Sequence, residues 1–168
     1  MPSMPSGPRA TAAVRAARRR NAVVFGCVVA AWLALDVATK AAAEGLERGT
    51  LAGSLVPGVV DVRLVHTTGG AWGLFGDMTV ALGVLSLAVC AAVAAYLFVL
   101  APASPVGAAV GLGLVFAGGV GNALDRFFRG YVVDFIDPAF IDFPVFNMAD
   151  IGVTCGIVVF VAALAVQA

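Results

Sequence analysis

Four long apolar runs dominate the pattern of this sequence. They cover about residues 22–43, 79–100, 106–124 and 148–166. Each is close to the roughly 20 apolar residues that a helix needs to cross the hydrocarbon core of a bilayer. Prolines in the short linker 101–105 separate the second run from the third. The pattern predicts an all-α integral membrane protein with four transmembrane helices.

Two more polar segments, residues 44–78 and 125–147, connect these runs. Within the first, residues 59–65 alternate as Val-Val-Asp-Val-Arg-Leu-Val, which favours a strand. Residues 53–57 are typical of a turn, and residues 72–75 predict a second strand with Trp72 and Phe75 near the membrane interface. We therefore expect a small β-element beside the helices.

Composition supports a membrane protein, because 61% of the residues are hydrophobic and only 12% are charged. A soluble domain has about 25% charged residues. The net charge is zero, so the charge balance indicates no nucleic-acid partner.

The basic residues are unevenly distributed, and five of the ten lie in residues 1–21. By the positive-inside rule this tail is cytoplasmic, and its Pro, Ser, Gly and Ala content predicts a disordered arm. Four spans then place both termini in the cytoplasm. Segments 44–78 and 125–147 are accordingly predicted to be extracytoplasmic and able to meet.

Residues 118–150 contain half of the ten acidic side chains, close to one edge of the membrane. Polar groups are costly there, so the cluster suggests a functional site. Three of the five have local explanations: Asp125 adjoins Arg126, Asp137 precedes a proline and Asp142 lies in a loop. The remaining two are Asp134, in an apolar run, and Asp150, at the start of the fourth span.

Asp134 and Asp150 suggest paired-carboxylate chemistry. If they face each other, one keeps a proton while the other ionises, as in aspartic proteases. Other interpretations stay open on spacing alone. Asn147 and Asp150 also fit a helix capping box. An acidic cluster suits Mg²⁺ or Mn²⁺ in a metal-dependent lipid-headgroup transferase, and intramembrane carboxylates suit a small proton-coupled transporter.

Two further sets of polar residues recur at helical spacing. Asp36 and Lys40 are four residues apart in the first span and predict an ion pair. Gly118, Asn122 and Arg126 share one face of the third span. Each set is explained either by helix packing and anchoring or by support for a nearby site.

The polar sequence boxes resemble the bacterial lipoprotein signal peptidase family, also called signal peptidase II, over nearly the whole chain from about Trp32. Five boxes occur in the family's order: 36–40 (D-x-x-T-K), 67–73 (N-x-G-x-A-[FW]), 118–126 (G-G-x-x-G-N-x-x-D-R), 132–135 (V-V-D-F) and 146–150 (F-N-M-A-D). One position departs from the family pattern, because Thr67 stands where the family usually has Asn. A hydroxyl lacks the reach of an amide, so the role of Thr67 is open.

The resemblance implies a membrane aspartic endopeptidase domain over residues 22–168, with Asp134 and Asp150 as the catalytic pair. The positions implied to bind substrate or support the site are Asn122, Arg126, Asn147, Asp36, Lys40, Gly118 and Thr67. Such enzymes use no metal or cofactor. They cut prolipoproteins just before a cysteine that carries diacylglycerol, and the cyclic peptide globomycin blocks them.

The same resemblance implies a multi-pass protein of the bacterial cytoplasmic membrane with its active site near the outer face. We expect membrane lipids and a lipid-modified prolipoprotein as partners, and a monomer. The aromatic residues Phe127, Phe128, Tyr131 and Phe135 suggest either a lid over the site or an interfacial aromatic belt.

Overall fold

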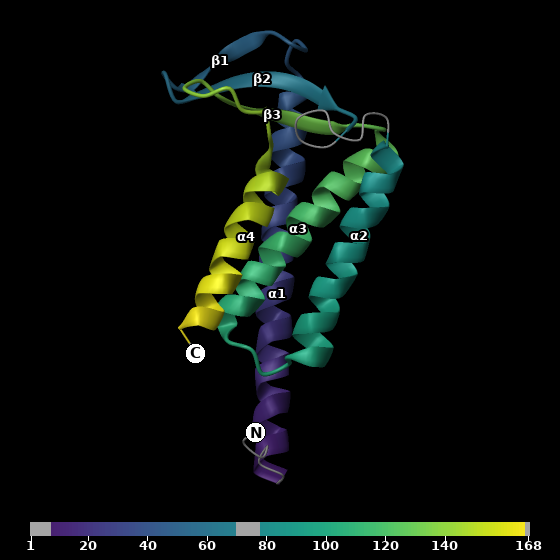
Figure 1. Cartoon of the computed structure of the whole chain (residues 1–168), viewed down its shortest axis with the longest axis vertical. Coiled ribbons are helices and arrows are strands. Elements are labelled where there is room, and N and C mark those ends of the chain that lie inside the picture. The colour runs from purple at the N-terminus through teal and green to yellow at the C-terminus, as the bar shows by residue number, and fades with distance from the viewer. Residues whose placement is uncertain (1–7, 70–77, 167–168) are drawn as a thin grey trace.

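A computed structural model describes residues 8–69 and 78–166 of the chain (Figure 1). The elements in chain order are α1 (Pro8–Ala43), β1 (Leu51–Val56), β2 (Val60–Thr67), α2 (Thr79–Ala95) with a π-helical turn η2 (Tyr96–Leu100), α3 (Val106–Phe128), β3 (Val132–Pro138) and α4 (Met148–Ala165). The four helices run side by side, and the strands lie together at one end of them (Figure 1).

Four helices occupy the predicted apolar runs. In the described ranges, four stretches are long and apolar enough to cross a membrane: Thr11–Ala43, Thr79–Leu100, Val106–Phe128 and Met148–Ala165. The first helix differs at its start, because α1 begins at Pro8 rather than near residue 22. The expectation of a disordered arm is thus corrected for residues 8–21. This stretch is rich in Ala and Arg, both strong helix formers.

Helix α3 lies at the centre of the bundle and contacts α1, α2 and α4 (Figure 1). Glycines allow the close approach of α4. A Cβ on Gly111 would lie 2.6 Å from the carbonyl oxygen of Gly156, and a Cβ on Gly118 would collide with the backbone of Ala149. The small residues of the third span therefore serve helix packing, as their spacing suggested.

The strands form one antiparallel sheet in the order β1-β2-β3. Strand β2 matches the predicted strand over residues 59–65. The turn predicted at 53–57 is wrong, because residues 51–56 are strand β1. All six β1 residues are exposed, so no apolar alternation marks this edge strand in the sequence. Strand β3 was not expected, and the strand predicted at 72–75 lies outside the described residues.

A small hydrophobic core fixes the sheet to the end of α1. It consists of Ala43, Leu64, Val133 and Phe135. At this end of the sheet β2 and β3 are in continuous register, with Val65 opposite Asp134 and Thr67 opposite Val132. The register and the core together hold Asp134 over the ends of the helices.

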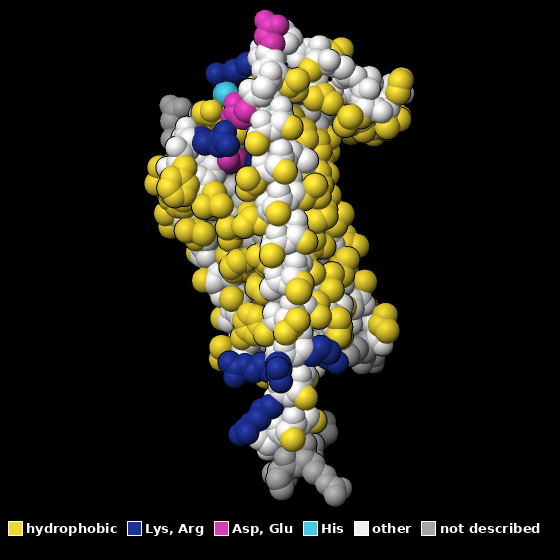
Figure 2. All heavy atoms as spheres, turned by 180° about the vertical axis from the view of Figure 1, so that it is seen from behind, with side chains coloured by type: hydrophobic (Ala, Val, Ile, Leu, Met, Phe, Trp, Pro, Cys, Tyr) yellow, Lys and Arg dark blue, Asp and Glu magenta, His cyan; other side chains and the backbone are white. Residues whose placement is uncertain are grey.

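The surface has three zones along the long axis. Figure 2 shows hydrophobic side chains over the length of the helices, a group of Lys and Arg near the N-terminal end, and charged side chains toward the sheet. An apolar belt between two polar ends is the distribution expected of a membrane-spanning bundle.

Candidate active site

Asn147 begins helix α4 and organises the polar groups around it. As the N-cap residue it has extended backbone angles (φ −137°, ψ −175°). Its side-chain oxygen accepts from the backbone N–H of Asp150 at 3.1 Å, and the carboxylate of Asp150 accepts from the backbone N–H of Asn147 at 3.1 Å. This reciprocal pair is the capping box that the spacing suggested.

Capping occupies only one oxygen of Asp150. The other, Oδ1, accepts from the side-chain amide of Asn122 at 2.8 Å. Asp150 can therefore both cap helix α4 and take part in a site, because the capping contact holds its carboxyl in place without occupying both oxygens.

Asp134 reaches the same cluster from strand β3. Its Oδ1 accepts from Nδ2 of Asn147 at 2.7 Å, and its Oδ2 accepts from the hydroxyl of Thr67 at 2.5 Å. Asp134 is 5% exposed and Asn147 is fully buried. One amide side chain thus contacts Asp134 and caps the helix turn that carries Asp150.

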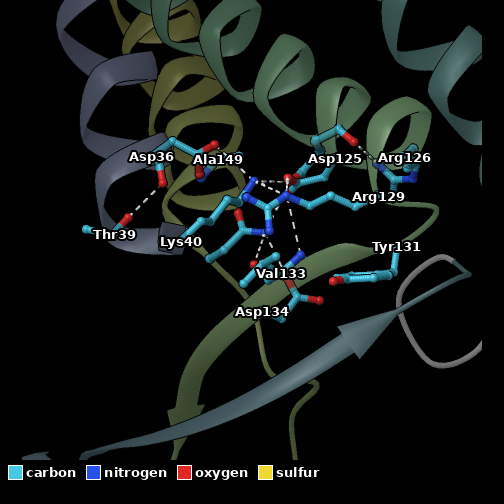
Figure 3. Close-up of polar contacts among 12 residues, drawn as sticks. Asp36, Thr39, Lys40, Asp125, Arg126, Arg129, Tyr131, Val133, Asp134 and Ala149 are labelled. Carbon is cyan, nitrogen blue, oxygen red and sulfur yellow. Dashed lines mark hydrogen bonds and ion pairs between the residues drawn. The ribbon is translucent and has the colours of Figure 1, made fainter. Parts of the chain in front are cut away.

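Lys40 anchors the cluster from helix α1 (Figure 3). Its ammonium lies 2.9 Å from a carboxylate oxygen of Asp36 and 2.9 Å from one of Asp125, and it donates to Oδ1 of Asn122 at 3.0 Å. The other oxygen of Asp36 accepts from the backbone N–H of Ala149 at 2.9 Å. The predicted Asp36–Lys40 ion pair is present and joins α1 to α3 and α4.

Asp125 pairs differently from its sequence-based interpretation. Its carboxylate contacts Lys40 and, through Oδ1, Nε of Arg129 at 3.1 Å, rather than its neighbour Arg126. It also accepts from the backbone N–H of Val133 at 3.3 Å. Successive helical residues point in different directions, whereas residues four apart share a face. Asp125 therefore ties β3 to α3.

Arg126 acts on the candidate catalytic carboxyls through its charge. Its Nη1 donates to the backbone oxygen of Asn122 at 3.3 Å. Its positive charge is close enough to attract Asp150, Asp134 and Asp125. Nε of Arg126 is buried with no hydrogen-bond partner among the described residues. Buried donors are usually hydrogen-bonded, so this N–H calls for a partner other than the described residues.

Burial dominates the electrostatics of Asp134 and raises the pKa of its carboxyl from the ordinary 3.8 to about 7. The hydrogen bond from Thr67 lowers this pKa, the charge of Asp150 raises it, and Asn147 and Lys40 lower it. A carboxyl with a pKa near neutrality can both accept and release a proton at the pH of the cell.

The structure places the other expected residues as follows. Gly118 brings α3 onto α4 without a side chain of its own. Tyr131 stacks on His66, with 3.8 Å between ring centroids, and its hydroxyl donates to Glu44. Phe135 is buried in the core under the sheet. Packing thus accounts for Tyr131 and Phe135. Within residues 8–69 and 78–166, no three His, Cys, Asp or Glu side chains are grouped to hold a metal ion.

A cavity of about 350 Å³ opens beside Asp150. Its lining residues are Phe143, Phe146, Asp150, Ile151, Thr154 and Cys155. Of these, Asp150 was expected as a site residue and Phe146 lies in the F-N-M-A-D box, whereas the sequence interpretation gave the other four no place in the site. Positions 151, 154 and 155 lie within about one helical turn of Asp150, and this spacing could have predicted that they line the same cavity.

The chain matches the family model described as signal peptidase (SPase) II over residues 28–166. The chain belongs to the signal peptidase II family. A lipoprotein signal peptidase of Parasynechococcus marenigrum is 36% identical over 131 residues, which cover 77% of this chain and 81% of that protein. One of Thermosynechococcus vestitus is 41% identical over 104 residues, which cover 62% of this chain and 65% of that protein, just under two thirds.

A solved structure of a bacterial membrane enzyme has the same fold. It superposes with a TM-score of 0.77 at 27% identity, covering 84% of this chain and 87% of the other. A second structure described in the same way gives a TM-score of 0.75 at 27% identity, with coverages of 83% and 91%. The four helices and the small antiparallel sheet are therefore the fold of this signal peptidase II family member.

Replacing the buried lysine tests the ion network. We expect Lys40→Met to lower the free energy of unfolding by about 3–5 kcal/mol, because it leaves two buried carboxylates without their cation. The matched control is Arg63→Met, which removes a 2.8 Å ion pair with Asp137 whose arginine side chain is 43% exposed. That change should cost about 0–1 kcal/mol. Denaturant titration in detergent measures both, and equal losses would contradict the network.

The raised pKa of Asp134 predicts a pH-dependent stability. The folded state keeps this proton up to about pH 7, whereas an unfolded chain releases it near 3.8. The stabilisation from Asp134 is thus complete below the unfolded pKa and is lost as pH rises toward 7. Over that window we expect unfolding free energy to fall by up to about 4 kcal/mol relative to Asp134→Asn. The exposed Asp142→Asn should keep the wild-type slope, and a wild-type slope in Asp134→Asn would contradict the burial argument.

Proposed function

We propose that the protein is a membrane aspartic endopeptidase in which Asp134 and Asp150 are the catalytic pair. The observation that carries this is the Asn147 amide, which hydrogen-bonds Asp134 and caps the turn that holds Asp150. The raised pKa of Asp134 supports it, because such a pair needs one proton between two carboxyls. Both groups come from one chain, so we expect the monomer to be sufficient.

In this reaction the ionised carboxylate takes a proton from a water molecule while the oxygen of that water attacks the scissile carbonyl carbon. The protonated carboxyl gives its proton to the carbonyl oxygen, and a tetrahedral gem-diol forms. When the gem-diol breaks down, one of its hydroxyls gives a proton back to the carboxyl that was protonated at the start. The carboxyl that took the proton from water passes it to the leaving nitrogen. The C–N bond breaks and both carboxyls regain their starting states.

Asn122, Lys40 and Asp36 take no proton in this scheme. Asn122 contacts Asp150 and Asn147, Lys40 holds Asn122, and Asp36 holds Lys40 and the backbone of Ala149, so together they keep the start of α4 in position. Arg126 adds a positive charge that acts on Asp134 and Asp150, and its Nε–H, which has no partner in the described part of the chain, is proposed to bind a carbonyl of the substrate backbone once the substrate is in place. Preorganised donors of this kind contribute to catalysis without rearranging during the reaction.

We propose that the substrate is the signal peptide of a diacylglyceryl-modified prolipoprotein, cut just before the modified cysteine. The relatives carry the name lipoprotein signal peptidase. Asp150 lies in the first turn of a membrane-spanning helix and Asp134 on strand β3 next to it, at the level where a lipid-anchored precursor would present its backbone. The cavity beside Asp150 is lined mainly by apolar side chains, including Phe143, Phe146 and Ile151, and so suits an apolar part of such a precursor.

We propose that the N-terminus is cytoplasmic and the sheet and site face the opposite side of the bacterial cytoplasmic membrane. The cluster of basic residues at the start of α1 supports this orientation. In intact cells, a membrane-impermeant maleimide should label Ser54→Cys in β1 and leave Ala103→Cys unlabelled until the cells are permeabilised. Wild type, with its own three cysteines, measures the background. The opposite labelling pattern would reverse the topology.

Cleavage of a diacylglyceryl-modified precursor by purified protein in detergent tests the reaction. We expect Asp134→Asn and Asp150→Asn each to lower kcat/KM by at least ~10³-fold, since each removes a group that handles a proton. Asp142→Asn, an exposed Asp in the loop between β3 and α4, is the matched control and should retain activity.

Two additions to the same assay separate the alternatives. Globomycin should block wild-type cleavage, and EDTA should leave it unchanged. Loss of activity with EDTA would instead support metal-dependent chemistry. Full activity in either asparagine variant would exclude the proposed pair.

A further inference from the structure

Thr67 contacts Asp134 directly, although the two residues are far apart in sequence. Thr67 is the last residue of β2, and its backbone is in register with Val132 of β3. Its hydroxyl lies 2.5 Å from Oδ2 of Asp134. The pairing of β2 with β3 therefore holds this hydroxyl against the carboxyl.

The second hydrogen-bond partner of Asp134 can only donate. Nδ2 of Asn147 contacts Oδ1 of Asp134 at 2.7 Å. The amide cannot flip by 180° without losing the helix cap, because its oxygen accepts a hydrogen bond from the backbone N–H of Asp150. An amide nitrogen has no acceptor lone pair, so Asn147 suits the ionised carboxylate and offers nothing to a carboxyl proton.

A hydroxyl differs from an amide nitrogen because one oxygen atom both donates and accepts. It can donate to the carboxylate and, after rotation about its own C–O bond, accept from the carboxylic acid. No heavy atom has to move between the two arrangements. Of the two side chains that hydrogen-bond Asp134 in the described chain, only Thr67 has this property.

We propose that the Thr67 hydroxyl is a positioning group that stays hydrogen-bonded to Asp134 in both protonation states of the carboxyl. The catalytic consequence rests on the proposed peptidase reaction, in which Asp134 gains and loses a proton in every turnover. A carboxyl held by Thr67 and Asn147 would make that exchange without leaving its place beside Asp150.

The charged groups around Asp134 fix the direction of the expected effect. Lys40 faces it from α1, Arg126 from α3 and Asp150 from α4. None of these changes when the Thr67 hydroxyl is removed. The hydroxyl binds the ionised carboxylate more strongly than the acid, because hydrogen bonds to a charged acceptor are stronger, and the contact therefore lowers the pKa of Asp134 in this structure. Removing the hydroxyl raises that pKa.

Three variants separate the hydroxyl from the shape of the side chain. Thr67→Val removes the hydroxyl and keeps the volume, and Thr67→Ser keeps the hydroxyl and removes the methyl. Thr50→Val is the matched control, because Thr50 is exposed and its hydroxyl donates to the backbone of Glu47 at 3.0 Å. If Thr67→Val does not fold by circular dichroism, Thr67→Ala replaces it.

The first readout needs no activity. Infrared spectra recorded across a pH titration follow the Asp134 carboxyl, and Asp134→Asn identifies its band. We expect Thr67→Val to raise the titration midpoint by about one pH unit, while Thr67→Ser and Thr50→Val keep the wild-type value. Below the midpoint, the C=O stretching band of protonated Asp134 should also move in Thr67→Val, because the acid loses its hydrogen bond to the hydroxyl. An unshifted acid band, or a wild-type midpoint, in the folded Val or Ala variant would overturn the proposal, since a merely structural role moves neither.

The second readout is the pH profile of precursor cleavage. The apparent pKa that the profile assigns to Asp134 should rise in Thr67→Val together with the infrared midpoint. We also expect a lower kcat and a smaller effect on KM. An infrared shift without any cleavage by wild type would leave the Thr67–Asp134 contact in place and reject the peptidase. Cleavage with an unshifted profile in Thr67→Val would reject the role of Thr67 alone.

Discussion

The side-chain amide of Asn147 makes four polar contacts at a position with no solvent exposure. Its oxygen caps helix α4, and its nitrogen lies within 3.2 Å of Asp134, Asn122 and the backbone oxygen of Val133. Water cannot replace these contacts, so losing one leaves an unsatisfied polar group in the interior. The start of α4, the strand β3 and the helix α3 are thereby held in one geometry, and the two carboxyls depend on it.

This arrangement needs a rigid support, and Lys40 provides it. A lone ammonium in an apolar bundle is strongly disfavoured, but here two carboxylates and one amide oxygen surround it. The network spans three helices that otherwise meet through small side chains and glycines. Glycine contacts such as Gly111 with Gly156 bring α3 and α4 close enough for Asn122 to reach Asp150. Helix packing and site geometry are therefore consequences of the same close approach.

Local patterns in the sequence predicted much of this structure. The spans follow from apolar runs of membrane length, the Asp36–Lys40 pair from spacing along one helix face, and the helix cap from Asn147 and Asp150. The resemblance to a known family brought Asp134 and Asp150 together, a pairing that spacing alone left open. Exposure hid β1, because an edge strand with every residue at the surface has no apolar alternation.

Contacts between segments that are distant in the sequence could not be predicted from it. Thr67 meets Asp134 only because β2 and β3 align Thr67 with Val132. The partner of Asp125 was misassigned to its sequence neighbour, although Lys40 on another helix fills that role. Both cases involve residues more than 60 positions apart, where no short-range rule applies.

The central claim is that Asp134 and Asp150 act as one unit, and a double-mutant cycle tests it most directly. kcat/KM for a lipid-modified precursor would be measured for wild type, Asp134→Asn, Asp150→Asn and the double variant. Groups that share one step are strongly non-additive, so the double variant should be no slower than the slower single variant. Losses that multiply in the double variant would show that the two carboxyls act independently and would contradict the account.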